Sequence, residues 1–179
     1  MAASLELIKS ATGSDVASVS VTDCFTNKFD VYVVTITKFK YVGTSNAGGM
    51  RFIDSGGSVI TDSEYDFADL QMRAYASFQE LDPSTFGSST STSILVGIDT
   101  DTANALELAT GLKAIIYNPF DSSSFTFTTF QSMTAQSATG GIGYKGIGVH
   151  KVAEQITGVN FVNRGTGNIN ATVNVYGVK

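Results

Sequence analysis

Hydrophobic and polar residues alternate along most of the chain, and residues that favour turns separate the alternating segments. A period of two places successive side chains on opposite faces of an extended strand. Residues Phe29–Phe39 are the clearest case. Both faces of this segment are rich in apolar groups, which predicts a central strand covered on both sides. Further strands are predicted at residues 4–9, 16–21, 50–53, 58–61, 70–80, 94–98, 112–117, 124–130, 142–152, 156–163 and 169–178.

Strands repeating every roughly 8–12 residues are typical of a two-sheet sandwich. The chain is therefore predicted to be all-β, an antiparallel two-sheet sandwich of about eight to ten strands with at most one or two short helices. Residues 1–179 are expected to form a single domain, because no Pro-rich or charged linker interrupts them. Ala103–Thr110 is predicted as a short helix or a continuation of the sheet, and Asp62–Asp69 as a helical turn.

Turn and loop signals lie between the predicted strands. Asp54–Gly57 is a hairpin-type connection, and Asn118–Asp121 contains a proline that presets φ for a tight reversal. Gly43–Gly49 is a turn-rich loop. Asp82–Ser93 is a low-complexity loop, long for a compact domain, and is predicted to be mobile or to form an interaction surface.

Composition agrees with a β architecture. Hydrophobic residues make up 42% of the chain and charged residues only 15%, so Ser, Thr and Gly supply much of the polar surface. Threonine fits pleated strands, whereas glycine and serine fit turns. The net charge of −5 argues against a nucleic-acid partner, since phosphate binding depends on clustered Lys and Arg.

Cysteine usage and apolar runs bear on localisation. Cys24 is the single cysteine, so an internal disulfide is excluded and folding in a reducing cytoplasm is expected. The opening residues lack a basic segment followed by an apolar one, and no stretch approaches the roughly 18 apolar residues that span a bilayer. Neither export by a standard signal nor membrane insertion is predicted.

A glycine-rich motif matches a nucleotide-binding pattern letter for letter. Gly141–Gly146 reads G-x-G-x-x-G, which binds dinucleotides when a strand precedes it and a helix follows. Here the following residues, Ile147–Val152, alternate like a strand. A glycine-rich β edge or bulge is therefore predicted, and no cofactor.

His150 is the single histidine, so a site built on two histidines is excluded. It is expected to be a hydrogen-bonded imidazole at the surface. Cys24 is expected to be a small buried hydrophobe. A Cys24–His150 dyad remains open on the sequence alone, although it is not the favoured interpretation.

Two groups of oxygen-bearing side chains could carry chemistry. One is spaced like a loose calcium loop but lacks the glycine at the sixth position and the spacing to the final bidentate glutamate of an EF-hand, which favours a solvated turn. The other could supply paired carboxylates for glycoside hydrolysis, but sequence spacing does not fix their separation, and an exposed acidic turn is predicted. The group resembling a calcium loop consists of Asp99, Asp101, Asn104 and Glu107. The group of possible paired carboxylates consists of Asp62, Glu64, Asp66 and Asp69. No catalytic, cofactor-binding or metal-ligating residue is predicted, and the chain is not expected to be an enzyme.

Several segments resemble those of small jelly-roll virion structural proteins of tailed bacteriophages, particularly marine ones, of the capsid decoration or tail fibre type. The resemblance covers about two thirds of the chain, and its motifs are structural, so no site residues follow from it. The matching segments are Leu5–Ile8, Phe29–Ile36, Ile116–Phe120, Ile156–Phe161, Gly167–Ile169 and Val173–Lys179.

This resemblance implies a jelly-roll-like sandwich in the virion, folded beforehand in the host cytoplasm. It implies a homotrimer or other ring that decorates or cements the capsid, with the major capsid protein or tail proteins as partners. The alternative function is a tail fibre or adhesion module that binds host surface glycan, although the chain has no tryptophan to stack on sugars. A small hydrolase is the third hypothesis.

Overall fold

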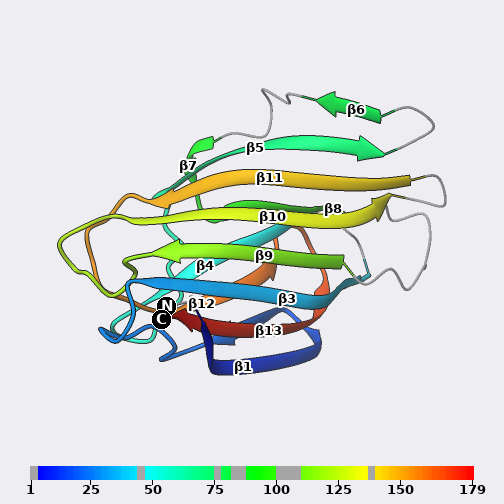
Figure 1. Cartoon of the computed structure of the whole chain (residues 1–179). Helices are drawn as coiled ribbons and strands as arrows, with labels where there is room; N and C mark the ends of the chain where they lie inside the picture. The colour runs from blue at the N-terminus through cyan, green and yellow to red at the C-terminus, as the bar shows by residue number, and fades with distance from the viewer. Residues whose placement is uncertain (1–3, 44–46, 75–77, 82–87, 100–109, 137–139) are drawn as a thin grey trace.

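The computed structural model describes residues 4–43, 47–74, 78–81, 88–99, 110–136 and 140–179 (Figure 1). These residues contain thirteen strands and no helix, and hence no helix that could cross a membrane. The strands are β1 (Leu5–Val16), β2 (Ser18–Val21), β3 (Val31–Val42), β4 (Ala47–Asp54), β5 (Tyr65–Ala74), β6 (Phe78–Leu81), β7 (Ser88–Ser91), β8 (Ile94–Asp99), β9 (Thr110–Tyr117), β10 (Thr126–Gln136), β11 (Gly140–His150), β12 (Ile156–Asn163) and β13 (Asn168–Val178).

All strand pairs are antiparallel, and they form two sheets. The large sheet has the order β1-β13-β3-β9-β10-β11-β5-β6, with β7 also paired to β5, and the small sheet has the order β2-β12-β4-β8. The predicted all-β sandwich is therefore confirmed. The strand number among the described residues is higher than the eight to ten expected, partly because β7 was not predicted and because the single strand predicted over residues 70–80 contains parts of both β5 and β6.

Eight of the strands form a jelly roll. The pairs β1/β13, β2/β12, β3/β9 and β4/β8 are nested along the chain, each inside the one before. Such nested pairing, folded over so that alternate pairs lie in opposite sheets, is the double Greek key of a jelly roll. The sheets are thus β1-β13-β3-β9 and β2-β12-β4-β8, as expected from the resemblance.

Two insertions widen the large sheet beyond the jelly roll. Strands β5, β6 and β7 come between β4 and β8, and the β10–β11 hairpin comes between β9 and β12. All five strands add to the β9 side of the large sheet, where they continue it as a broad extension (Figure 1). The extension gives this sheet a wide outer face, meaning the face turned away from the small sheet.

The core lies between the sheets and follows the alternating pattern. In β13 every second residue is buried, including Ile169, Val173 and Val175. Phe161 of β12 and Tyr32 of β3 are fully buried in the same hydrophobic cluster. The central position predicted for Phe29–Phe39 is confirmed, because β3 lies between β13 and β9.

Turn predictions succeeded where a hairpin was indicated. The amide of Gly57 donates to the carbonyl of Asp54 at 3.1 Å, and Ile53 forms a bridge with Val59. Two other assignments were wrong. The segment predicted as one strand over residues 70–80 contains parts of two paired strands, β5 and β6. The acidic segment Asp62–Asp69, predicted as a helical turn, is β-strand from Tyr65 onward, where β5 begins.

Two predicted loops and one predicted helix overlap parts of the chain that are not described. Within the low-complexity segment 82–93, Ser88–Ser91 forms β7 rather than loop. Within the predicted loop 43–49, residues 47–49 belong to β4. The proposed helix at 103–110 lies outside the described residues, apart from Thr110, which begins β9.

Candidate docking face and histidine cluster

The outer face of the sheet extension carries large apolar side chains that remain exposed to solvent. Residues paired directly across antiparallel strands project to the same side of a sheet. Phe127 pairs with Tyr117 on one side and with Val149 on the other. Met133 pairs with Gly143, which in turn pairs with Met72. The side chains of Phe127, Met133 and Met72 therefore project from the outer face. We call the exposed members the apolar outer face, namely Leu70, Met72, Phe127, Met133 and Ile147, which are 37–74% exposed.

This face is hollowed. A hollow of about 710 Å³ is lined by Leu70, Ile115 and Ile147 among others, and a second of about 380 Å³ is lined by Tyr117, Phe127 and Val149 among others. Ala68, Thr129 and Ile147 line both hollows, so they adjoin each other. Contiguous exposed apolar surface of this kind marks sites where another molecule docks.

Two lysines lie beside the apolar outer face. Lys113 of β9 and Lys145 of β11 both pair with Gln131 and are exposed, and both line the larger hollow. Neither forms an ion pair with a carboxylate among the described residues. A chain with a net charge of −5 thus places two lysines beside this apolar face, neither of them in an ion pair within the described part of the chain.

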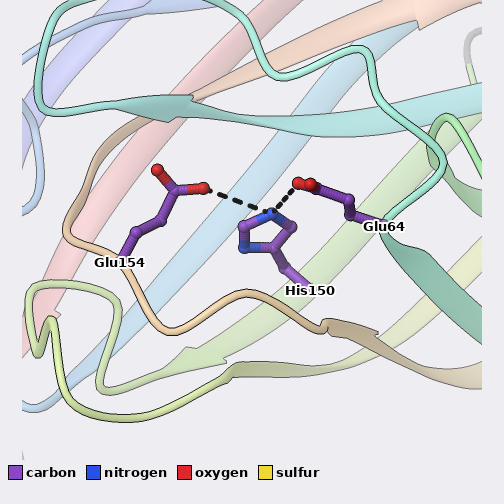
Figure 2. A group of neighbouring side chains, drawn as sticks. All are labelled: Glu64, His150 and Glu154. Atoms are coloured by element: carbon purple, nitrogen blue, oxygen red, sulfur yellow. Dashed lines mark hydrogen bonds and ion pairs between the residues drawn. The ribbon is translucent and has the colours of Figure 1, made fainter.

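A second candidate site lies at one end of the β5–β11 pair. His150 is the last residue of β11, Glu64 directly precedes β5, and Glu154 lies in the connection to β12 (Figure 2). The Nε2 atom of His150 is 3.2 Å from Oε2 of Glu64 and 3.5 Å from Oε1 of Glu154. Both carboxylates therefore face the same nitrogen of one imidazole. We call these three residues the histidine cluster.

The surroundings fix the imidazole and leave the carboxylates partly in solvent. The His150 side chain is fully buried, whereas those of Glu64 and Glu154 are 34% exposed. The Tyr65 ring lies 5.2 Å from the imidazole, and the Lys151 amide donates to the Glu64 carbonyl at 2.9 Å. The surface position predicted for His150 was wrong, because the imidazole is fully buried and packs near the rings of Tyr65 and Phe52.

The electrostatics of the histidine cluster are asymmetric. Burial raises the pKa of the Glu154 carboxyl above its usual value, and the nearby carboxylates of Glu64 and Asp54 add to the rise, while His150 opposes it. On the other side of the imidazole, Nδ1 is buried and has no hydrogen-bond partner. The cluster thus concentrates negative charge on the solvent side of Nε2.

The acidic residues near Glu64 do not form one exposed turn as predicted. Asp66 forms an ion pair with Lys151 at 2.8 Å, and Asp62 is exposed. Asp69 is only 7% exposed, and neither of its carboxylate oxygens has a hydrogen-bond partner. Burial raises the pKa of Asp69 to about 6. These acids therefore occupy separate environments.

The glycine-rich motif is part of a continuous strand. β11 pairs with β10 and β5 without register shifts, and a strand rather than a helix was correctly predicted after the motif. The edge or bulge prediction was wrong, because β11 is internal to the sheet. Two of its glycines are packing positions: a Cβ at Gly146 would overlap the Phe130 ring, and one at Gly148 would lie 2.7 Å from Ile94.

Cys24 is a buried hydrophobe, as expected. Its thiol donates to the Val21 carbonyl at 3.2 Å, and burial raises its pKa to about 12. Since the thiolate is the reactive form, Cys24 should resist alkylation by iodoacetamide at pH 8 in the native protein and react promptly in denaturant, as followed by mass spectrometry. Rapid labelling of the native chain would contradict this environment and revive a nucleophilic role.

The group resembling a calcium loop is not placed by the structure. Asp101, Asn104 and Glu107 lie outside the described residues, and only the backbone of Asp99 is described, at the end of β8.

The histidine cluster was missed from the sequence. Glu64 and His150 are separated by 86 positions, and the pairing of β11 with β5, which sets His150 opposite Tyr65, brings them together. The spacing of His150 and Glu154 by four residues was the one local signal. The apolar outer face was also missed, although Phe127 and Ile147 each stand in an alternating segment.

Comparison with known proteins adds little. No protein-family model and no curated protein matches the chain. Among solved structures, the carbohydrate recognition domain of Emp47p aligns with 98% of this chain and 87% of its own at 9% identity, with a TM-score of 0.30. A similarity at this level carries no argument about function.

Proposed function

We propose that the chain is a structural protein of a tailed-bacteriophage particle, which docks through its apolar outer face onto another virion protein as a decoration or cement of the capsid. The observation that carries the proposal is the exposed cluster of Leu70, Phe127, Met133 and Ile147 over adjoining hollows. The jelly-roll pairing and the resemblance of both chain ends to phage virion proteins support the setting.

The charge on the face favours a particular partner. Lys113 and Lys145 lack carboxylate partners among the described residues, so a partner with an apolar strip beside Asp or Glu side chains would complement both features. A second copy would bring the same two cations to the interface. The expected occupant is therefore an acidic surface of the major capsid protein or a tail protein, while trimers or rings of the chain itself would use other surfaces.

Two measurements test this proposal. Mass spectrometry of purified virions from the source phage is expected to detect the chain in many copies, and its absence would overturn the virion setting. For docking, the purified chain would be mixed with particles that lack it, and co-sedimentation would be measured. Ile147→Glu is expected to weaken binding about tenfold or more, because it places a charge in the centre of the face.

The matched control is Leu5→Glu, which makes the same change at a side chain 56% exposed on β1, at the far end of the large sheet. It should bind like the wild type. Equal binding by wild type and Ile147→Glu would contradict docking through this face. Light scattering completes the test: if the wild type self-associates and Ile147→Glu makes it monomeric, the occupant is a second copy rather than another virion protein.

The glycan-binding alternative has one observation in its favour. Phe127 and Tyr117 line the smaller hollow, and aromatic rings can stack on sugar faces. Sugar binding also needs convergent polar groups, and the side chains around this hollow are mostly apolar, so protein docking is preferred. Binding to a host polysaccharide array that is lost in Phe127→Ala would support the alternative instead.

A further inference from the structure

We propose that Glu64, His150 and Glu154 bind a divalent transition-metal ion of the Zn²⁺ class, and that this ion ties the β11–β12 connection to the start of β5. The inference does not depend on the docking function. It rests on the donor set, its geometry, its charge and its access to solvent (Figure 2).

The donor set suits a borderline metal ion. The cluster offers one imidazole nitrogen and two carboxylate oxygens, all within 4.8 Å of one another. Zn²⁺ takes histidine nitrogen and carboxylate oxygen, whereas Mg²⁺ and Ca²⁺ prefer all-oxygen sites. Three protein ligands leave a fourth tetrahedral position for water or for a group of a partner molecule.

The spacing of the donors suits the same ion. With metal–ligand bonds of about 2.0–2.1 Å, the edges of a coordination tetrahedron are roughly 3.3–3.4 Å long. The Nε2 atom of His150 lies 3.2 Å from the nearer oxygen of Glu64 and 3.5 Å from that of Glu154. The three donor atoms lie within 4.8 Å of one another, so the two glutamates, which are partly exposed, would rotate to bring their oxygens to this spacing around a cation.

Charge provides a further reason. The nitrogen that faces both carboxylates carries at most one hydrogen, which points well at only one acceptor. The second carboxylate then lies near the first without a well-aligned hydrogen bond from this nitrogen. A divalent ion at this point would bind both carboxylates and the imidazole lone pair together, and the 34% exposure of both glutamates leaves it a route from solvent.

The outer surroundings set the expected strength. Metal-binding histidines usually donate their second ring N–H to an acceptor, and loss of such a partner costs roughly 10- to 100-fold in affinity. Nδ1 of His150 has no partner. We therefore expect micromolar binding rather than the much tighter binding of a closed structural zinc site.

The test is titration of the chelator-treated full chain with ZnCl₂ by calorimetry, with CoCl₂ as a spectroscopic probe. One Zn²⁺ per chain, visible d–d absorption of bound Co²⁺ and a rise in melting temperature with added Zn²⁺ are expected. His150→Ala can fail to fold because the imidazole is buried, so the diagnostic variants are Glu64→Gln and Glu154→Gln. Each removes a direct ligand and is expected to weaken binding at least about tenfold.

Asp62→Asn is the control, because Asp62 is an exposed carboxylate two residues from Glu64 and outside the histidine cluster. It should bind Zn²⁺ like the wild type. The proposal is overturned if the wild type binds neither Zn²⁺ nor Co²⁺ at millimolar concentration, or if both glutamine variants bind as the wild type does. It is also overturned if Mg²⁺ binds as well as Zn²⁺, which would indicate a nonspecific acidic surface.

Discussion

Phe161→Ala is expected to lower the free energy of unfolding by about 3–5 kcal/mol, the largest effect predicted for a single substitution in this chain. Phe161 is fully buried on β12, between the flanking strands β2 and β4 of the small sheet. Its ring belongs to the hydrophobic cluster shared by both sheets. Truncation loses the transfer free energy of the ring and leaves a cavity that the surrounding strands can only partly close.

Urea unfolding followed by circular dichroism measures this change. The control is Met133→Ala, since the Met133 side chain is 74% exposed on the outer face and its truncation should alter stability by less than about 0.5 kcal/mol. Similar losses in the two variants would mean that the two sheets do not share the core described above.

The second large effect is expected at Asp69, whose replacement should stabilise the protein. Asp69→Asn is predicted to raise the free energy of unfolding at pH 8 by up to about 2–3 kcal/mol, because it removes a buried, unpaired negative charge. The pKa of the carboxyl is about 6 in the folded chain, against an ordinary value of 3.8. Between these values the folded state binds more protons than the unfolded state.

The sign of the pH dependence follows from this difference. The stability of the wild type should increase as pH falls from about 7 to about 4, by up to about 2–3 kcal/mol from this group. The advantage of Asp69→Asn should therefore be largest above pH 7 and vanish below about pH 4. Urea unfolding at intervals from pH 4 to pH 8 tests this expectation, with Asp62→Asn as the exposed control. An advantage that does not change with pH would contradict it.

The strands that could be predicted from sequence are those whose alternate residues enter the core. β3 and β13 show the pattern clearly because one face of each is buried against the small sheet. β7 (Ser88–Ser91) contains only Ser and Thr and gives no hydrophobic signal. β5 was partly missed because Asp66 and Asp69 resemble turn residues, whereas the pairing of β5 with β11 makes this segment a strand despite their low strand preference.

The sites were harder to predict than the fold. A lone histidine carries no information about its neighbours until strand pairing is known, and here β11 and β5 place His150 beside Glu64. The apolar outer face was hidden for another reason: an alternating strand with apolar residues on both faces predicts burial on both sides, and in β3 Val33 on the outer face is indeed buried. In β10 and β11 the same kind of pattern leaves Phe127 and Ile147 exposed to solvent.

The nested strand pairs also constrain how the chain can fold during synthesis. β1 lies against β13, so that Ser10 and Asn174, 164 positions apart, are hydrogen-bonded through their side chains. No early segment can complete its own sheet while the ribosome is still producing the later strands. Contacts between residues so far apart in sequence make folding slow. Until the later strands are synthesised, the incomplete chain exposes unpaired strand edges that can pair with other chains and cause aggregation. Overexpression at low temperature or with chaperones should therefore improve the yield of native protein.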